Sequence, residues 1–299
     1  MITAQNVTMK FDDFEALSNL SCTIPEGCIY GLVGSNGAGK STFLRLISGV
    51  YKPNSGTIKI DDMTILENPE TKKKIIYVPD ELFFIPQANM NRMADFYSSI
   101  YDSFSKERFE NLTKTFGLNP KQPIATFSKG MKRQASTILA LSCMPEYIYF
   151  DETFDGLDPV MRNLVKTVIY NDVYERKTTA VITSHSLREL EDTCDQLALL
   201  HKGGIIFESD IGDLKTALFK IQIAFDREYE KDLFDGIEML NFSKKGRVAS
   251  FIARGDKDKT TELLRGMSPV ILDVLPLSLE EVFVYEMEAL GYAFKDILM

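Results

Sequence analysis

The sequence lacks three features that would assign it to other classes of protein. It has no apolar run near the roughly 20 residues that a membrane-spanning helix needs, and its N-terminus has neither the basic start nor the apolar stretch of a signal peptide. Its formal net charge is −9, from 34 basic and 43 acidic residues, whereas non-specific nucleic-acid binders cluster basic charge. We therefore expect no nucleic-acid partner, and we expect any membrane role to depend on another protein.

Cysteine is also scarce. The four cysteines, Cys22, Cys28, Cys143 and Cys194, show no paired spacing of the metal-binding type. Reduced and mostly packed thiols of a cytosolic protein are the expected state. The 44% hydrophobic and 26% charged content is ordinary for a folded protein, and 299 residues suffice for one large domain or two smaller ones.

The sequence does contain a glycine-rich loop between two apolar runs. Residues 34–42 read Gly-Ser-Asn-Gly-Ala-Gly-Lys-Ser-Thr, which matches the P-loop pattern G-x-x-x-x-G-K-[ST]. The run 28–33 is typical of a buried strand, and the run 43–47 of a helix. Glycines allow backbone N–H groups to point at phosphate oxygens, and a helix that begins at Lys40 adds its positive end to the same place.

The P-loop predicts a site for a nucleotide triphosphate. Lys40 would supply positive charge for the β- and γ-phosphates, and the Ser41 hydroxyl a ligand for Mg²⁺. A chance glycine loop is the alternative, and the strand–loop–helix context argues against it. The predicted nucleotide-binding residues of the loop are Ser35, Asn36, Gly37, Ala38, Gly39, Lys40, Ser41 and Thr42.

Two carboxylates follow a second apolar run. Residues 147–150 read as a buried strand, and Asp151 and Glu152 stand at its end. Such a strand delivers its last residue to the carboxyl edge of the sheet, where phosphates bind in open α/β folds. Asp151 is then placed to hold Mg²⁺, and Glu152 to polarise the attacking water as a general base. A solvated Asp-Glu pair is the alternative.

The order of predicted elements indicates two domains. Residues 1–213 read as an α/β nucleotide-binding core with a helical subdomain inserted at about 88–145. Residues 214–299 read β-α-β-β-α-β-α, with helices at 229–234 and 278–290 among them, which predicts a small ferredoxin-like α+β domain. The second domain has no catalytic constellation, and a structural or docking role is favoured for it.

Three further segments make the chain resemble the ATP-binding subunits of ABC transporters. Residues 127–134, Phe-Ser-Lys-Gly-Met-Lys-Arg-Gln, resemble the ABC signature, and residues 154–159 resemble the D-loop. His185 follows an apolar strand where the family has its switch histidine, and Phe11 stands where the family has an aromatic that stacks on adenine. The motifs are ordered and correctly spaced over residues 1–210, so together they are far more specific than any one of them.

The resemblance implies an ATPase with ATP and Mg²⁺ as cofactors. It implies that two such chains, identical or related, work beneath a separate membrane permease on the cytoplasmic face of the membrane. Ser128 and Gly130 of one chain would face the γ-phosphate held by the other, and His185 would contact the γ-phosphate. Ser128 is also expected to cap the helix through 131–141. The segment 276–283 is similar to exporter subunits of antibiotic-responsive or drug-resistance systems in Gram-positive bacteria.

Three positions depart from the family pattern. Lys129 stands where the signature usually has its first glycine, and Met131 where it has glutamine. Asp80 stands where the family has the glutamine of the Q-loop, which contacts Mg²⁺ and senses the permease. A carboxylate can still ligate Mg²⁺, so Asp80 joins Ser41 and Asp151 as a predicted metal ligand, while its coupling role stays open.

Alternatives to a transporter subunit remain. The aromatic segment 82–86 marks a partner surface if it is exposed, and core packing is the other interpretation. A soluble ABC ATPase that acts on ribosomes or DNA is one alternative function, but the chain has one cassette, no sustained heptads and an acidic charge. A weakly catalytic nucleotide-binding regulator is another, which Asp80 leaves open. A kinase or GTPase explains neither residues 128–130 nor His185.

Overall fold

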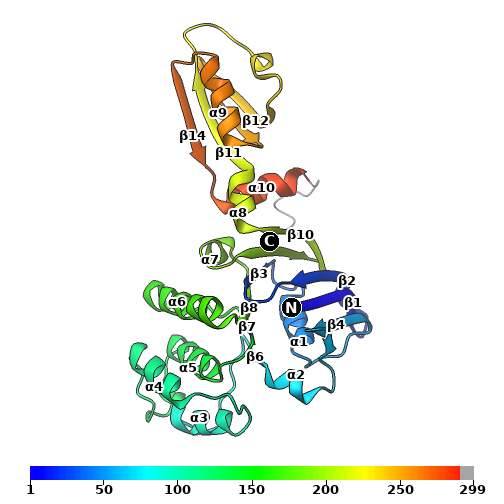
Figure 1. Cartoon of the computed structure of the whole chain (residues 1–299), viewed down its shortest axis with the longest axis vertical. Helices are drawn as coiled ribbons and strands as arrows, with labels where there is room; N and C mark the ends of the chain where they lie inside the picture. The colour runs from blue at the N-terminus through cyan, green and yellow to red at the C-terminus, as the bar shows by residue number, and fades with distance from the viewer. Residues whose placement is uncertain (290–299) are drawn as a thin grey trace. The chain divides into compact units, whose positions relative to one another are not determined.

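Short buried strands build the central parallel sheet. The computed structural model describes residues 1–289 (Figure 1). Its six-stranded sheet has the order β10 (Gly204–Asp210), β9 (Gln196–His201), β3 (Ile29–Val33), β8 (Thr179–Ser184), β7 (Tyr147–Asp151) and β6 (Ile75–Val78). The five strands from β9 to β6 pair in parallel, and every residue of β3, β7 and β8 is buried. Continuous apolar runs are what a sheet covered on both faces requires.

A second sheet and helix α1 complete the core. Its strands lie in the order β2 (Phe14–Ile24), β1 (Ile2–Phe11), β4 (Ser55–Ile60) and β5 (Met63–Thr64). Helix α1 (Lys40–Ile47) contacts both sheets through buried side chains such as Phe43 and Leu44. Strand β2 is long, from Phe14 to Ile24, because it forms an extended antiparallel pair with β1. All four cysteines are free and buried, as expected.

The predicted helical subdomain is present. It contains α3 (Met90–Ser98), α4 (Lys106–Thr115), the 3-10 turn η1 (Ile124–Thr126) and α5 (Lys129–Ser142). The remaining helices up to residue 208 are α2 (Pro69–Lys73), α6 (Pro159–Arg176) and α7 (Leu187–Glu191). Buried Asp172 on α6 forms ion pairs with Arg108 of α4 and with Arg176, the latter at 3.0 Å. This network ties the helical subdomain to the helix that follows β7.

The chain divides into the compact units Met1–Glu208 and Ser209–Met299. Within the second unit the strands lie in the order β12 (Glu238–Lys245), β13 (Val248–Arg254), β11 (Leu218–Ala224) and β14 (Ile271–Pro276), and all neighbouring pairs are antiparallel. Its helical elements are α8 (Ile211–Ala217), the 3-10 turn η2 (Lys231–Phe234), α9 (Lys257–Gly266) and α10 (Leu279–Ala289). Leu290, the predicted end of the last helix, lies outside the described residues.

One predicted helix of the second unit was wrong. The segment 229–234 forms only the short turn η2. The side chains of Tyr229 and Phe234 are both buried in the core of this unit, and Gly236, with φ of +94°, turns the chain into β12. Anchoring both aromatic side chains in so short a connection leaves no room for a regular helix.

We predict that Asp172→Ala lowers the free energy of unfolding by about 2–3 kcal/mol. This is less than the roughly 3–5 kcal/mol typical of a broken buried pair, because Arg108 and Arg176 are 24% and 22% exposed and can regain water. Urea unfolding measures the change. Glu175→Ala, at an exposed position of the same helix, is the control and should change stability by less than about 0.5 kcal/mol. Equal losses in both variants would contradict the assignment.

Candidate active site

The glycine-rich loop joins β3 to α1 and is shaped by close backbone contacts. Gly39, at the start of α1, has φ of +110°. A Cβ atom there would lie 2.6 Å from the Ala16 carbonyl oxygen and 2.7 Å from Leu17 Cδ2. A Cβ at Gly34 would lie 2.4 Å from the Leu200 carbonyl oxygen. Only glycine fits at these two positions, and the loop therefore lies directly against β2 and β9.

Lys40 and Ser41 project from the first turn of α1 into the site. The buried Lys40 Nζ donates hydrogen bonds to the carbonyl oxygens of Gly34, at 2.7 Å, and Ser35, at 3.1 Å. It also forms an ion pair with Glu152 Oε1 at 3.3 Å. The Ser41 hydroxyl donates to Asp151 Oδ1 at 3.0 Å. The structure thus brings together the P-loop and the two carboxylates that the sequence analysis singled out.

Asp151 ends β7 and is only 1% exposed. Besides the bond from Ser41, its Oδ1 accepts one from the Thr183 hydroxyl at 2.8 Å, and its Oδ2 accepts one from the Tyr77 hydroxyl at 2.9 Å. Burial and the Asp151 carboxylate raise the pKa of Tyr77, so this hydroxyl stays protonated as a donor. Sequence reasoning missed Tyr77 and Thr183, which lie near the carboxyl ends of the two strands that pair with β7.

Glu152 turns away from the sheet immediately after Asp151. Its φ is +48°, in the left-handed region that non-glycine residues rarely adopt. The backbone N–H of Glu152 donates to the Thr183 hydroxyl at 3.1 Å, and Glu152 Oε2 lies 3.1 Å from His185 Nδ1. Glu152 is thus held between Lys40 and His185, and strained backbone of this kind is typical of functional sites.

The predicted signature residues lie at the start of α5. Ser128 caps this helix as expected, with its hydroxyl oxygen accepting a hydrogen bond from the Met131 N–H at 3.2 Å. A Cβ at Gly130 would lie 3.0 Å from the Gly156 carbonyl oxygen, and Lys129 Nζ forms an ion pair with Asp155 at 2.8 Å. The signature segment therefore contacts the loop that follows Glu152.

Two other predicted residues lie apart from this cluster. Asp80 forms an ion pair with the buried guanidinium of Arg133 on α5, rather than with Ser41 or Asp151. Phe11, at the end of β1, is 40% exposed and makes an edge-on contact with Tyr51, with ring centroids 5.5 Å apart. The metal role of Asp80 and the adenine-stacking role of Phe11 stay predictions.

The residues at the P-loop fit a Mg²⁺ ion. The buried Asp151 carboxylate is bonded by three neutral hydroxyls, and no basic side chain pairs with it among the described residues. Carboxylate and hydroxyl oxygens are the hard donors that Mg²⁺ prefers. Within residues 1–289 no cluster of three His, Cys, Asp or Glu side chains could hold a metal. A Mg²⁺ ion here would therefore take its other ligands from phosphates and water, as Mg²⁺ usually does.

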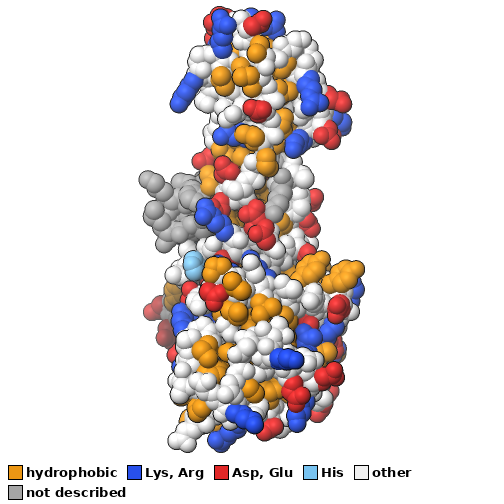
Figure 2. Space-filling view, turned by 90° about the vertical axis from the view of Figure 1, so that its left-hand side faces the viewer, with side chains coloured by type: hydrophobic (Ala, Val, Ile, Leu, Met, Phe, Trp, Pro, Cys, Tyr) orange, Lys and Arg blue, Asp and Glu red, His pale blue; other side chains and the backbone are white. Residues whose placement is uncertain are grey.

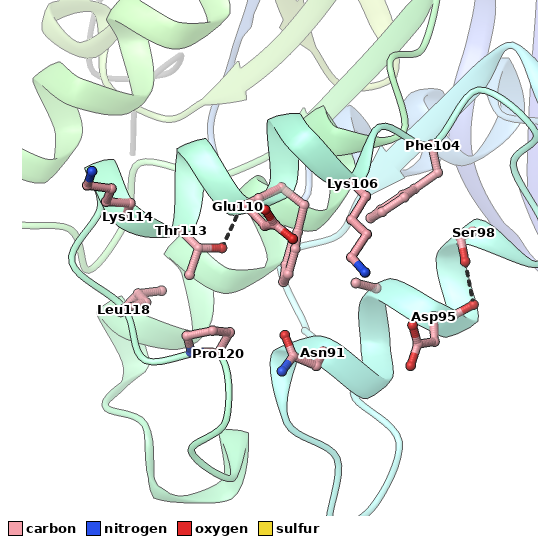
Figure 3. A pocket seen from close by; sticks show the side chains of 12 residues that line it. Asn91, Asp95, Ser98, Phe104, Lys106, Glu110, Thr113, Lys114, Leu118 and Pro120 are labelled. Atoms are coloured by element: carbon pink, nitrogen blue, oxygen red, sulfur yellow. Dashed lines mark hydrogen bonds between the residues drawn. The ribbon is translucent and has the colours of Figure 1, made fainter.

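A separate pocket of about 750 Å³ lies in the helical subdomain. Figure 3 shows it between α3, α4 and the loop at Leu118 and Pro120. The hydroxyls of Ser98 and Thr113 each donate to a carbonyl oxygen of their own helix, so their protons are already used within the helices. None of the P-loop residues lines this pocket, and it is not part of the predicted nucleotide site.

Comparison with known proteins gives a consistent assignment. The family model described as "ABC transporter" matches residues 17–155. The chain is 32% identical to the ABC transporter ATP-binding protein YtrB of Bacillus subtilis (strain 168), over 95% of this chain and 97% of YtrB. It is 32% identical to the linearmycin resistance ATP-binding protein LnrL of the same organism, over 73% and 72%. It is 27% identical to the daunorubicin/doxorubicin resistance ATP-binding protein DrrA of Streptomyces peucetius, over 73% and 67%.

Solved structures share the fold. An ATP-binding subunit of an ABC transporter matches with a TM-score of 0.66 and 24% identity, over 72% of this chain and 92% of that chain. A bacterial ABC transporter cassette in dimeric form matches with a TM-score of 0.65 and 23% identity, over 71% and 99%. The expected α/β ATPase core is therefore confirmed.

We predict that two glycines of the P-loop differ in their tolerance of alanine. Gly37 has φ of +80° but open space where a Cβ would lie. Gly37→Ala should therefore lower the free energy of unfolding by only about 1–2 kcal/mol, the cost of placing alanine in a left-handed conformation. Gly39→Ala adds a clash with backbone and should cost at least about 3 kcal/mol. Urea unfolding and binding of a fluorescent ATP analogue measure both effects. Equal losses in the two variants would contradict the packing described here.

Proposed function

Since the chain belongs to the ABC transporter family as one of its ATP-binding, ATP-hydrolysing subunits, we propose that it powers export through a separate membrane permease. The observation that supports this most strongly is the cluster of Lys40, Ser41, Asp151, Glu152 and His185 at one edge of the parallel sheet. Such an edge is where open α/β folds bind phosphates. The proposed export role rests on the names of the relatives LnrL and DrrA.

In this proposal the P-loop N–H groups, from Ser35 to Thr42, and the Lys40 ammonium bind the phosphates of ATP. Ser41 and Asp151 hold Mg²⁺, which would neutralise charge on the phosphates when bound. Asp80 would join them only after releasing Arg133, with which it is now paired. Phe11, exposed at the end of β1, stacks on the adenine.

Glu152 acts as the general base. Its two carboxylate oxygens are held separately, Oε1 by Lys40 at 3.3 Å and Oε2 by His185 at 3.1 Å. A phosphate bound to Lys40 would compete for that ammonium and release Oε1 to accept a proton from water. His185, which is 57% exposed, would then orient Glu152 and contact the γ-phosphate as a charge-stabilising donor.

We further propose that two chains act as a pair. Ser128 is exposed at the start of α5, where backbone N–H groups favour an anion. Ser128 and Gly130 would contact the nucleotide held by the second chain, and ATP would close the pair while hydrolysis reopens it. The dimeric cassette among the similar structures supports this arrangement.

The permease would contact the segment 82–86. None of these five residues is buried, and Phe83 is 78% exposed. Exposed aromatic side chains of this kind mark partner surfaces.

The described part of the chain holds no helix with the length and apolarity to cross a membrane. From the family assignment we propose that the subunit is peripheral, on the cytoplasmic face of the membrane. We also propose that the two compact units serve as an ATP-binding and an accessory domain.

The cargo class follows from the relatives. LnrL and DrrA are resistance proteins by name, for linearmycin and for daunorubicin and doxorubicin. We propose that this chain serves the export of an antibiotic. A ribosome- or DNA-associated ATPase is not favoured. On the face shown in Figure 2, Lys and Arg side chains of the described residues alternate with Asp and Glu and form no continuous basic surface, which nucleic-acid binding would require.

Co-purification from the native membrane tests this proposal. The tagged chain is isolated with and without a non-hydrolysable ATP analogue, and its partners are identified by mass spectrometry. We expect a polytopic membrane protein to be recovered. Recovery of ribosomal or DNA-bound proteins without a membrane protein would refute the exporter role and favour the soluble ATPase.

We predict that Glu152→Gln retains ATP binding but lowers turnover by about 10²–10⁴-fold, the usual contribution of a general base. The variant should also accumulate as an ATP-bound dimer, because the step that reopens the pair is blocked. Phosphate release and size-exclusion chromatography with MgATP measure the two effects. Glu175→Gln, at an exposed position of α6, is the control with unchanged turnover. Hydrolysis by Glu152→Gln at near the native rate would exclude the base role.

A further inference from the structure

The hydroxyl of Tyr77 reaches the metal-binding carboxylate from the neighbouring strand. β6 and β7 are parallel, and Tyr77 lies directly opposite Tyr149 in their register. Asp151 stands two residues after Tyr149, so side chains at these three positions share one face of the sheet. The Tyr77 side chain extends along that face, and its hydroxyl donates a hydrogen bond to Asp151 Oδ2 at 2.9 Å.

The two oxygens of Asp151 are bound differently. Oδ1 accepts from Ser41 and Thr183, at 3.0 and 2.8 Å. Oδ2 accepts from Tyr77 alone among the hydrogen bonds of the described residues. The Tyr77 hydroxyl therefore fixes the rotation of the carboxyl group, which keeps Oδ1 beside the Ser41 hydroxyl.

We propose that Tyr77 is a positioning residue for the metal site, which orients the Asp151 carboxylate so that Asp151 and Ser41 bind one divalent cation together. This inference rests on the proposed function of Ser41 and Asp151 and adds a residue to it. Groups that hydrogen-bond to a metal-binding carboxylate fix its orientation, and their loss typically costs 10–100-fold in metal affinity.

Arg45 of α1 lies near Tyr77 and contacts Tyr51. The Arg45 guanidinium interacts with the hydroxyls of both Tyr77 and Tyr51, and it lies 3.5 Å from the Tyr51 oxygen and 5.8 Å from the centre of that ring. The Tyr77 hydroxyl has a single proton, and it donates that proton to Asp151 Oδ2. Tyr51 also contacts Phe11. Contacts therefore run from Phe11, through Tyr51, to Arg45.

The adjacent strand offers a matched control. The Tyr149 hydroxyl is buried and has no hydrogen-bond partner. Tyr149→Phe and Tyr77→Phe each remove one hydroxyl from facing positions of the same strand pair. Only Tyr77→Phe removes a bond to Asp151, so a general effect of losing a buried hydroxyl can be separated from a loss at the metal site.

The experiment uses the full-length chain with Mn²⁺ as the probe. Electron paramagnetic resonance of free Mn²⁺, titrated in the presence of ADP, gives the metal affinity. Binding of a fluorescent ATP analogue in EDTA gives nucleotide affinity without metal. We expect Tyr77→Phe to weaken Mn²⁺ affinity about 10–100-fold and to leave metal-free nucleotide binding within about twofold of the native value. Tyr149→Phe should change neither quantity by more than about twofold.

Native Mn²⁺ affinity in Tyr77→Phe would overturn the inference, and so would an equal loss in Tyr149→Phe. Thermal unfolding checks that each variant is folded. If Tyr77→Phe does not fold, Tyr77→Leu decides instead, because it also removes the hydroxyl that bonds Asp151: weakened Mn²⁺ binding supports the inference, and native binding overturns it. If the native chain itself bound no Mn²⁺ with ADP, the proposed function would fail rather than the role of Tyr77 alone.

Discussion

A carboxylate at the end of a fully buried strand loses most of its hydration, and at Asp151 three hydroxyl groups take the place of water. Burying an unpaired charge is costly, and here three hydroxyls offset the cost. Ser41 comes from α1, Thr183 from β8 and Tyr77 from β6, so one buried group determines how three elements meet at the sheet edge. A divalent cation beside Asp151 would supply the charge that neutral hydroxyls do not.

The position of the Glu152 carboxylate depends on that of Asp151. Because Asp151 completes β7, Glu152 is the first residue free to leave the sheet, and its left-handed backbone at φ of +48° directs its side chain toward Lys40 and His185. Two adjacent acids thereby acquire different surroundings: Asp151 lies among hydroxyls that suit a metal, and Glu152 lies between the Lys40 ammonium and the His185 imidazole. Acid and base roles commonly separate in this way when neighbouring environments differ.

The correct predictions rest on patterns of a few consecutive residues, whereas the missed contacts depend on how distant strands pair. The P-loop, the strand that ends in Asp151 and the cap at Ser128 are each defined by a few consecutive residues, and they were predicted correctly. Tyr77 was missed because its role depends on the parallel pairing of β6 with β7, which no local pattern specifies. The absent helix at 229–234 had a different cause, since the burial of two aromatic side chains overrode local helical patterning.

Two residues that depart from the family pattern also form ion pairs with residues distant in the sequence. Lys129 and Asp80 each introduce a charge where the family usually has an uncharged residue, and each is paired within the chain, with Asp155 and Arg133 respectively. Both pairs involve the first turns of α5, so they join the signature segment to the loops after β7 and β6. Lys129 and Asp155 are exposed, and their pair contributes little stability. Arg133 is almost fully buried, so Asp80 cannot move to a metal without leaving a buried cation unpaired, and this cost favours Asp80 as a link between the sheet and the helical subdomain over Asp80 as a metal ligand.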